Sequence, residues 1–150
     1  MDIVNRKDLV FYEKDWNSSD LSDKRNMLLT IYGKVSCGKL KFIDDNVEGY
    51  VEIPSSILGD DKYFVLKCDG DSMINIGIKK GDLLVIKMQS HAENGDIAVV
   101  ELDNKVTLKR FYKLEDKKLY KLHPENDKYD DIYLEKCNIL GVAVKIIKDI

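Results

Sequence analysis

The sequence predicts a mostly β domain over residues 32–150, and three observations support this prediction. Short runs rich in β-branched and aromatic residues recur along this part of the chain. Proline, glycine and Asp-Gly or Asn-Gly pairs separate the runs, as in an all-β domain. The last run is almost continuously apolar, which is typical of a strand buried on both faces or at an interface. A chain of 150 residues is long enough to bury one core.

We expect strands, in chain order, over residues 49–53, 63–68, 83–86, 97–102, 105–112, 118–122 and 139–147. Pro54 ends the first of them, because proline cannot donate a hydrogen bond to a neighbouring strand. Asp69-Gly70 ends the second, and Gly81-Asp82 opens the third. Asp103-Asn104 connects two of the runs as the turn of a hairpin.

Residues 1–31 have a different character, and we predict a flexible N-terminal arm or linker there. The segment mixes acidic and basic residues and contains the polar cluster 17–20 just before Leu21, where a Ser or Asp is suited to begin a short helix as its cap. A helix-turn-helix DNA-binding domain needs about three helices. We therefore expect no complete DNA-binding domain in this chain.

The composition describes a soluble globular protein. Hydrophobic residues make up 44% and charged residues 34% of the chain, and the net charge is −3, which favours neither a disordered chain nor a nucleic-acid surface. No apolar run is long enough for a spanning helix, and the first residues lack the apolar stretch of a signal peptide. We expect a cytoplasmic protein that does not contact membranes. Its three cysteines, an odd number, are expected to be reduced thiols.

The candidate chemistry lies in two segments that are 37 residues apart (109 − 72). Ser72 follows an expected strand, and Lys109 lies within another. A serine becomes a nucleophile at neutral pH when a neutral lysine amine takes its proton. Taken alone, each residue has a commoner explanation: Asp71-Ser72 as a helix cap or turn, and the lysine as a solvated strand residue.

Catalysis makes demands on the fold that the structure can test. A free lysine, with a pKa of about 10.4, is almost wholly charged at neutral pH, so burial must lower the pKa of Lys109. The strand-to-turn junction at Ser72 is also suited to an oxyanion hole, for which the backbone amides of Asp71 and Ser72 are the candidates. Ahead of both segments lies Cys37-Gly38, a small residue followed by glycine, which allows a tight bend and close approach to a nucleophile.

These segments together resemble the self-cleaving LexA-type repressors and the related UmuD-type polymerase subunits. The resemblance covers roughly residues 32–150 and rests on four motifs in order. The motifs are Gly70-Asp71-Ser72-Met73-Ile74 with Gly77-Ile78 and Gly81-Asp82, then Val106-Thr107-Leu108-Lys109-Arg110, then Leu122-His123-Pro124-Glu125-Asn126, and finally Ile139-Leu140-Gly141-Val142.

The resemblance implies a LexA/UmuD-like, signal-peptidase-like β-fold with Ser72 as nucleophile and Lys109 as general base. It implies that the chain is its own substrate, cut between Cys37 and Gly38. It also implies a homodimer, and cleavage stimulated by a RecA filament on single-stranded DNA after DNA damage. No cofactor or metal is implied.

Several alternatives stay open at the level of sequence. The chain is either the peptidase domain of a repressor, with DNA bound through a domain absent from this chain, or a complete UmuD-type subunit whose partner is an error-prone polymerase. A non-cleaving dimerisation or binding module with the same fold is the strongest non-enzyme alternative. The three cysteines and two histidines lack the ligand spacing of a zinc site, and neither His91 nor His123 lies in a recognisable catalytic setting. We interpret His123 as a loop residue.

Overall fold

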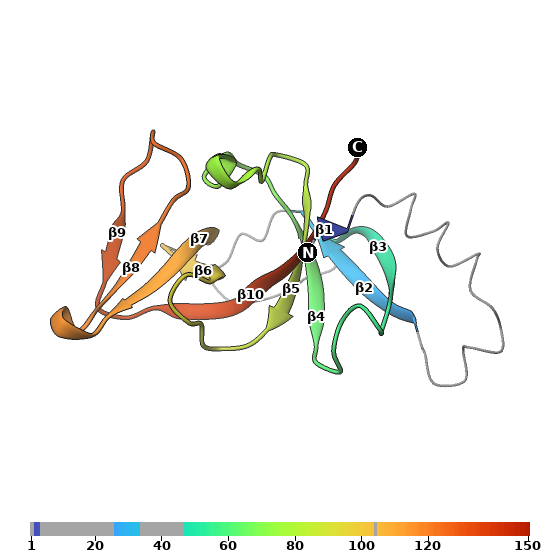
Figure 1. Cartoon of the computed structure of the whole chain (residues 1–150), viewed down its shortest axis with the longest axis horizontal. Coiled ribbons are helices and arrows are strands. Elements are labelled where there is room, and N and C mark those ends of the chain that lie inside the picture. Colours follow the sequence, from blue (N-terminus) through green and yellow to red (C-terminus); the bar gives the residue numbers. More distant parts are fainter. Residues whose placement is uncertain (1, 4–25, 34–46, 104) are drawn as a thin grey trace.

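The computed structural model describes residues 2–3, 26–33, 47–103 and 105–150 (Figure 1). The strands form one sheet in the order β3-β2-β4-β5-β10-β6-β7-β8-β9, with β1 paired to β10 outside this path. The strands are β1 (Asp2–Ile3), β2 (Asn26–Tyr32), β3 (Val47–Pro54), β4 (Tyr63–Lys67), β5 (Leu83–Met88), β6 (Ile97–Leu102), β7 (Lys105–Leu114), β8 (Leu119–His123), β9 (Ile132–Leu134) and β10 (Asn138–Ile147).

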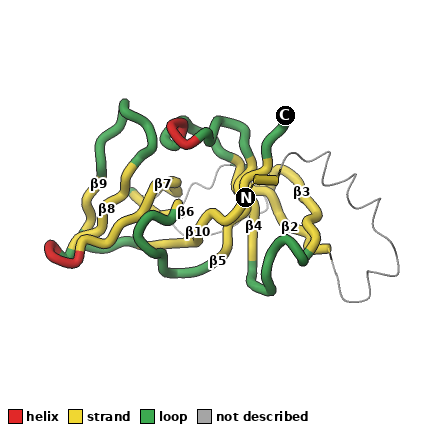
Figure 2. Tube along the Cα trace, in the orientation of Figure 1, coloured by secondary structure: helices red, strands yellow, loops and turns green. Residues whose placement is uncertain are grey.

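Helix in the described part is limited to two short 3-10 segments, η3 (Ile74–Ile76) and η4 (Glu115–Lys117), which are red in Figure 2. The prediction of a mostly β fold is therefore confirmed. The expected strand over residues 97–102 coincides with β6, and the other expected strands overlap β3, β4, β5, β7, β8 and β10.

The sequence interpretation missed β2, which begins at Asn26 inside the segment assigned to the arm. β2 pairs antiparallel with β3 and parallel with β4, so it is an integral part of the sheet. Leu29 and Ile31 are buried, whereas Leu28 is 64% exposed. The three consecutive apolar residues from Met27 hide this alternation in the sequence.

Strand β10 joins the two halves of the sheet and crosses the middle of the molecule in Figure 1. It pairs antiparallel with β5 on one side and with β6 on the other, and both pairings contain a register shift. A strand with neighbours on both sides makes no free edge, and most of its first half is buried. This placement explains the apolar run that marked residues 139–147 in the sequence.

Gly141 is required where β10 lies between its two neighbours. A Cβ at this position would come 2.5 Å from Cγ2 of Ile86 and 2.5 Å from the backbone oxygen of Lys87. Because a backbone oxygen in a paired strand cannot move aside, Gly141→Ala is expected to lower the free energy of unfolding by about 2–3 kcal/mol. Urea denaturation measures this loss.

The matched control is Gly70→Ala, since a Cβ at Gly70 would meet nothing within 4 Å. Its expected effect is below about 0.5 kcal/mol. Equal losses in the two variants would show that the contacts around Gly141 do not limit stability.

Among the residues that the structure describes, the hydrophobic core consists of three clusters, of which one supports the candidate site. This central cluster includes Met73 and Leu108, the chain neighbours of Ser72 and Lys109. Its other buried members are Phe64, Leu66, Ile78, Leu84, Ile86, Val99 and Leu140. The two segments singled out in the sequence are thus packed into the same core, which fixes their relative positions.

Candidate active site

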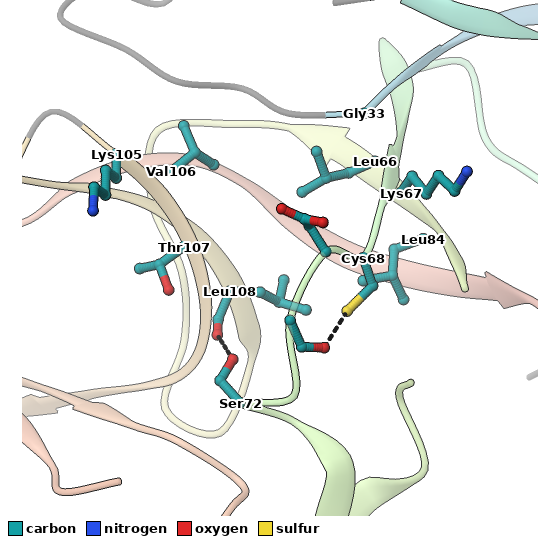
Figure 3. A pocket seen from close by; sticks show the side chains of 12 residues that line it. Gly33, Leu66, Lys67, Cys68, Ser72, Leu84, Lys105, Val106, Thr107 and Leu108 are labelled. Carbon is teal, nitrogen blue, oxygen red and sulfur yellow. Dashed lines mark hydrogen bonds between the residues drawn. The ribbon is translucent and has the colours of Figure 1, made fainter. Parts of the chain in front are cut away.

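Ser72 lies in the turn between β4 and η3. The next residue, Met73, is 1% exposed and is the N-cap of η3, where no side-chain hydrogen bond caps the helix. Ser72 is therefore not a helix cap. Its partly buried hydroxyl donates a hydrogen bond of 3.3 Å to the backbone oxygen of Leu108, which Figure 3 marks with a dashed line.

Lys109 lies on β7 and is only 8% exposed, so it is not the solvated lysine that its pattern suggests. Its Nζ donates to Oγ1 of Thr107 at 2.5 Å and to the backbone oxygen of Leu108 at 3.2 Å. Alternate residues of a strand share a face, and this places Thr107 beside Lys109. The strand geometry thus holds the Nζ atom at a fixed position.

The two side chains converge on one atom, the backbone oxygen of Leu108. Ser72 Oγ and Lys109 Nζ both donate to it, from residues 37 positions apart in the chain. Within the described part, Oγ and Nζ form no hydrogen bond with each other. The structure therefore brings the candidate nucleophile and the candidate base to the same acceptor atom.

Burial lowers the pKa of Lys109 from its ordinary value of 10.5. The charge of an ionised Cys68 would oppose this shift. However, burial also raises the pKa of the Cys68 thiol, which keeps this group neutral at physiological pH. The environment thus favours the neutral amine that a general base needs.

A groove of about 470 Å³ opens beside Ser72. One wall comes from the end of β4 and the residues that follow it, the other from the beginning of β7, and Gly33 lies at its edge (Figure 3). The apolar side chains of Leu66, Leu84 and Val106 line the groove. Cys37 and Gly38, the predicted cleavage site, lie outside the described residues.

Comparison with known proteins adds the family to this geometry. Residues 30–144 match the family model described as Peptidase S24-like, which covers most of the chain. The chain belongs to the S24 peptidase family. The resemblance inferred from the four motifs is therefore confirmed, and the fold is the one that it implied.

The S24 chain is also similar to LexA repressors. It is 36% identical to that of Desulfitobacterium hafniense over 132 residues, 38% identical to that of Syntrophomonas wolfei over 120 residues, and 39% identical to that of Clostridium acetobutylicum over 131 residues. These matches cover 88%, 80% and 86% of this chain. They cover 64%, 58% and 63% of the relatives, so the chain spans less than two thirds of their length.

Residues 124–131, the β8–β9 loop, contribute contacts that the sequence interpretation did not assign to the S24 site. Asn126, 6% exposed, donates from Nδ2 to the backbone oxygen of Asp71 at 2.7 Å. Tyr129 donates to the carboxylate of Asp71 at 2.6 Å, and this hydrogen bond is the main reason that the pKa of Asp71 is lowered. The Pro-Glu-Asn motif marked this loop in the sequence, but only the structure shows what it holds.

The same loop also contacts β7 beside Lys109. Arg110 Nε lies 2.7 Å from Oε1 of Glu125, and its Nη1 donates to the backbone oxygen of Gly95 at 2.6 Å. His123 is the last residue of β8 and not a loop residue as interpreted; its Nδ1 lies 2.5 Å from Oδ1 of Asp131. The histidine thus contacts Asp131, at the end of this loop.

Two further features concern the described part of the S24 chain. No group of three or more His, Cys, Asp or Glu side chains is arranged there to hold a metal ion. None of the helices in these residues has the length and apolar character needed to cross a membrane.

Proposed function

We propose that this chain is the serine-lysine peptidase domain of a LexA-like repressor and that it cuts its own Cys37-Gly38 bond. The observation that carries the proposal is the burial of Lys109 with its Nζ at the carbonyl to which Ser72 donates. A structural lysine in a strand gains nothing from such a position, because burial of the charged form is costly. A lysine that acts as the base for serine requires this burial, because burial favours its neutral form.

The position of Gly33 supports a tethered substrate. Gly33 ends the described segment that contains β2, and it lines the groove beside Ser72. Cys37 follows four positions later (37 − 33), a distance that an extended chain spans with roughly 13 Å. The predicted cleavage site is therefore close enough along the chain to Gly33 to reach the groove.

In the proposed mechanism, neutral Lys109 takes the proton of Ser72 Oγ while Oγ bonds to the carbonyl carbon of Cys37. The backbone amides of Asp71 and Ser72 stabilise the resulting oxyanion. Protonated Lys109 then gives its proton to the Gly38 nitrogen, the C–N bond breaks, and an ester forms between Ser72 and Cys37. Water hydrolyses this ester with Lys109 again as the base.

The proposed role within the cell follows the LexA repressors. Residues 32–150, extended by β2 from Asn26, form the peptidase and dimerisation domain. The predicted arm or linker is attached to this domain at its start, where β1 pairs with β10. DNA is bound through a domain outside this chain, and cleavage ends repression after DNA damage. A RecA filament stimulates cleavage by favouring the state in which the cleavage segment is docked.

The test uses the purified chain with a RecA filament on single-stranded DNA and an ATP analogue at about pH 7. The expected product is a fragment that begins at Gly38, identified by N-terminal sequencing, and Ser72→Ala should yield none. A parent chain that stays intact both with the filament and at about pH 10 would contradict the proposal and favour a non-cleaving module.

A further inference from the structure

We propose that Asn126 is a positioning residue for the oxyanion hole, acting through the peptide bond between Asp71 and Ser72. The inference rests on the proposed function, because it assigns the residue that orients one of the two candidate amides. Three observations on the described residues carry it: the hydrogen bonds of the Asn126 side chain, the geometry of the peptide that it holds, and the anchoring of the loop that carries it.

Both ends of the Asn126 amide are used, and this fixes its orientation. Nδ2 donates to the backbone oxygen of Asp71 at 2.7 Å, and Oδ1 accepts from the backbone N–H of Lys128 at 3.0 Å. A flipped amide would place an oxygen against the Asp71 oxygen and an NH2 against the Lys128 N–H. The side chain is 6% exposed, so water does not replace these partners at low cost.

The Asp71-Ser72 peptide bond is trans, and in a trans peptide the carbonyl and the following N–H point in opposite directions. Asn126 binds the carbonyl, together with a weaker hydrogen bond of 3.3 Å from the N–H of Ile74. The N–H of Ser72 therefore points away from the β8–β9 loop. No described residue of that loop lines the groove beside Ser72. We therefore place the substrate on the side to which this N–H points.

The loop is itself anchored to both halves of the candidate site. The backbone oxygen of Glu125 accepts from the N–H of Asn75 at 2.7 Å, next to the nucleophile turn. The carboxylate of Glu125 pairs with Arg110, the residue after Lys109. The loop that carries Asn126 thus contacts both the serine turn and the lysine strand. This anchoring suits a residue that orients a backbone amide.

The test compares Asn126→Ala and Asn126→Asp with the parent and with the control Asn138→Ala, a remote asparagine whose exposed side chain donates to Glu101. Asn126→Asp keeps the volume and the acceptor for Lys128 but removes the donor to Asp71. Self-cleavage is followed against pH, Ser72 is labelled with a fluorophosphonate probe, and thermal unfolding is recorded. Loss of the oriented amide should slow cleavage and labelling about 10- to 100-fold in both Asn126 variants.

In Asn126→Ala, the pH at which cleavage reaches half its maximal rate should stay at the parent value, because Lys109 is untouched. A shift of that pH, or a rate within threefold of the parent, would overturn the inference. Thermal unfolding of both variants below the assay temperature would assign Asn126 to stability and also overturn it. A parent that neither cleaves nor labels would instead mark failure of the proposed function itself.

Discussion

Lys109→Met is expected to abolish self-cleavage and at the same time to stabilise the fold near neutral pH. The loss of the general base should slow cleavage about 10²- to 10⁴-fold. Methionine fills a similar volume without an amine, so the cost of holding an ammonium at an 8% exposed position disappears. We expect the free energy of unfolding to rise by roughly 1–3 kcal/mol, measured by urea denaturation.

The size of this effect depends on pH in a defined way. The pKa of Lys109 is lowered in the folded state, so the unfolded chain binds the extra proton between that lowered pKa and 10.5. The parent therefore gains stability as pH rises through this window, and Lys109→Met does not. The advantage of the variant should be largest near neutral pH and vanish near the ordinary lysine pKa.

These unfolding measurements are made in the Ser72→Ala background, where no chain is cut. The matched control is Lys113→Met, on the same strand, whose side chain is 55% exposed. It should change stability by less than about 0.5 kcal/mol at every pH. A destabilised Lys109→Met, or an equal gain in Lys113→Met, would contradict the claim that Lys109 is held at a cost for chemistry.

Raising the pH without any partner is expected to accelerate self-cleavage. Only the neutral fraction of Lys109 can accept the serine proton, and this fraction grows roughly tenfold per pH unit below the pKa of the group. Because burial lowers that pKa, the rate should level off below pH 10.5. The measurement is the single-turnover rate of cleavage between about pH 7 and pH 10.

Circular dichroism across the same range shows whether the fold stays intact. Burial raises the pKa of the Cys68 thiol, and its thiolate, once formed, would favour the charged form of Lys109. A Cys68→Ala chain measured alongside separates the two groups. A rate that stays flat with intact folding would contradict the role of Lys109 as the base.

Most of the fold could be predicted from the sequence because its strands carry strong local signals. Residues 97–102 are bounded by turn residues on both sides, and the strand β6 has those bounds. β2 was missed because its exposed Leu28 breaks the apolar and polar alternation. β9, with three residues, is too short for any periodicity to show.

The candidate site was only partly predictable, since its chemistry depends on contacts between distant segments. Spacing and resemblance indicated Ser72 and Lys109, but the burial of the lysine depends on contacts in the folded sheet that no local pattern encodes. In the sequence Thr107 is an ordinary strand residue, and only the structure shows that its hydroxyl accepts a hydrogen bond from Nζ of Lys109. Asn126 lies 55 positions from Asp71, so neither segment by itself predicts their hydrogen bond.

The most direct test of the central claim is intact-mass analysis of the parent, Ser72→Ala and Lys109→Ala after incubation at about pH 7 and about pH 10. The account predicts fragments whose masses meet at Cys37-Gly38 in the parent alone, with more product at the higher pH. Fragments of the same masses in either variant would contradict it, since the cut would then not depend on the serine and the lysine.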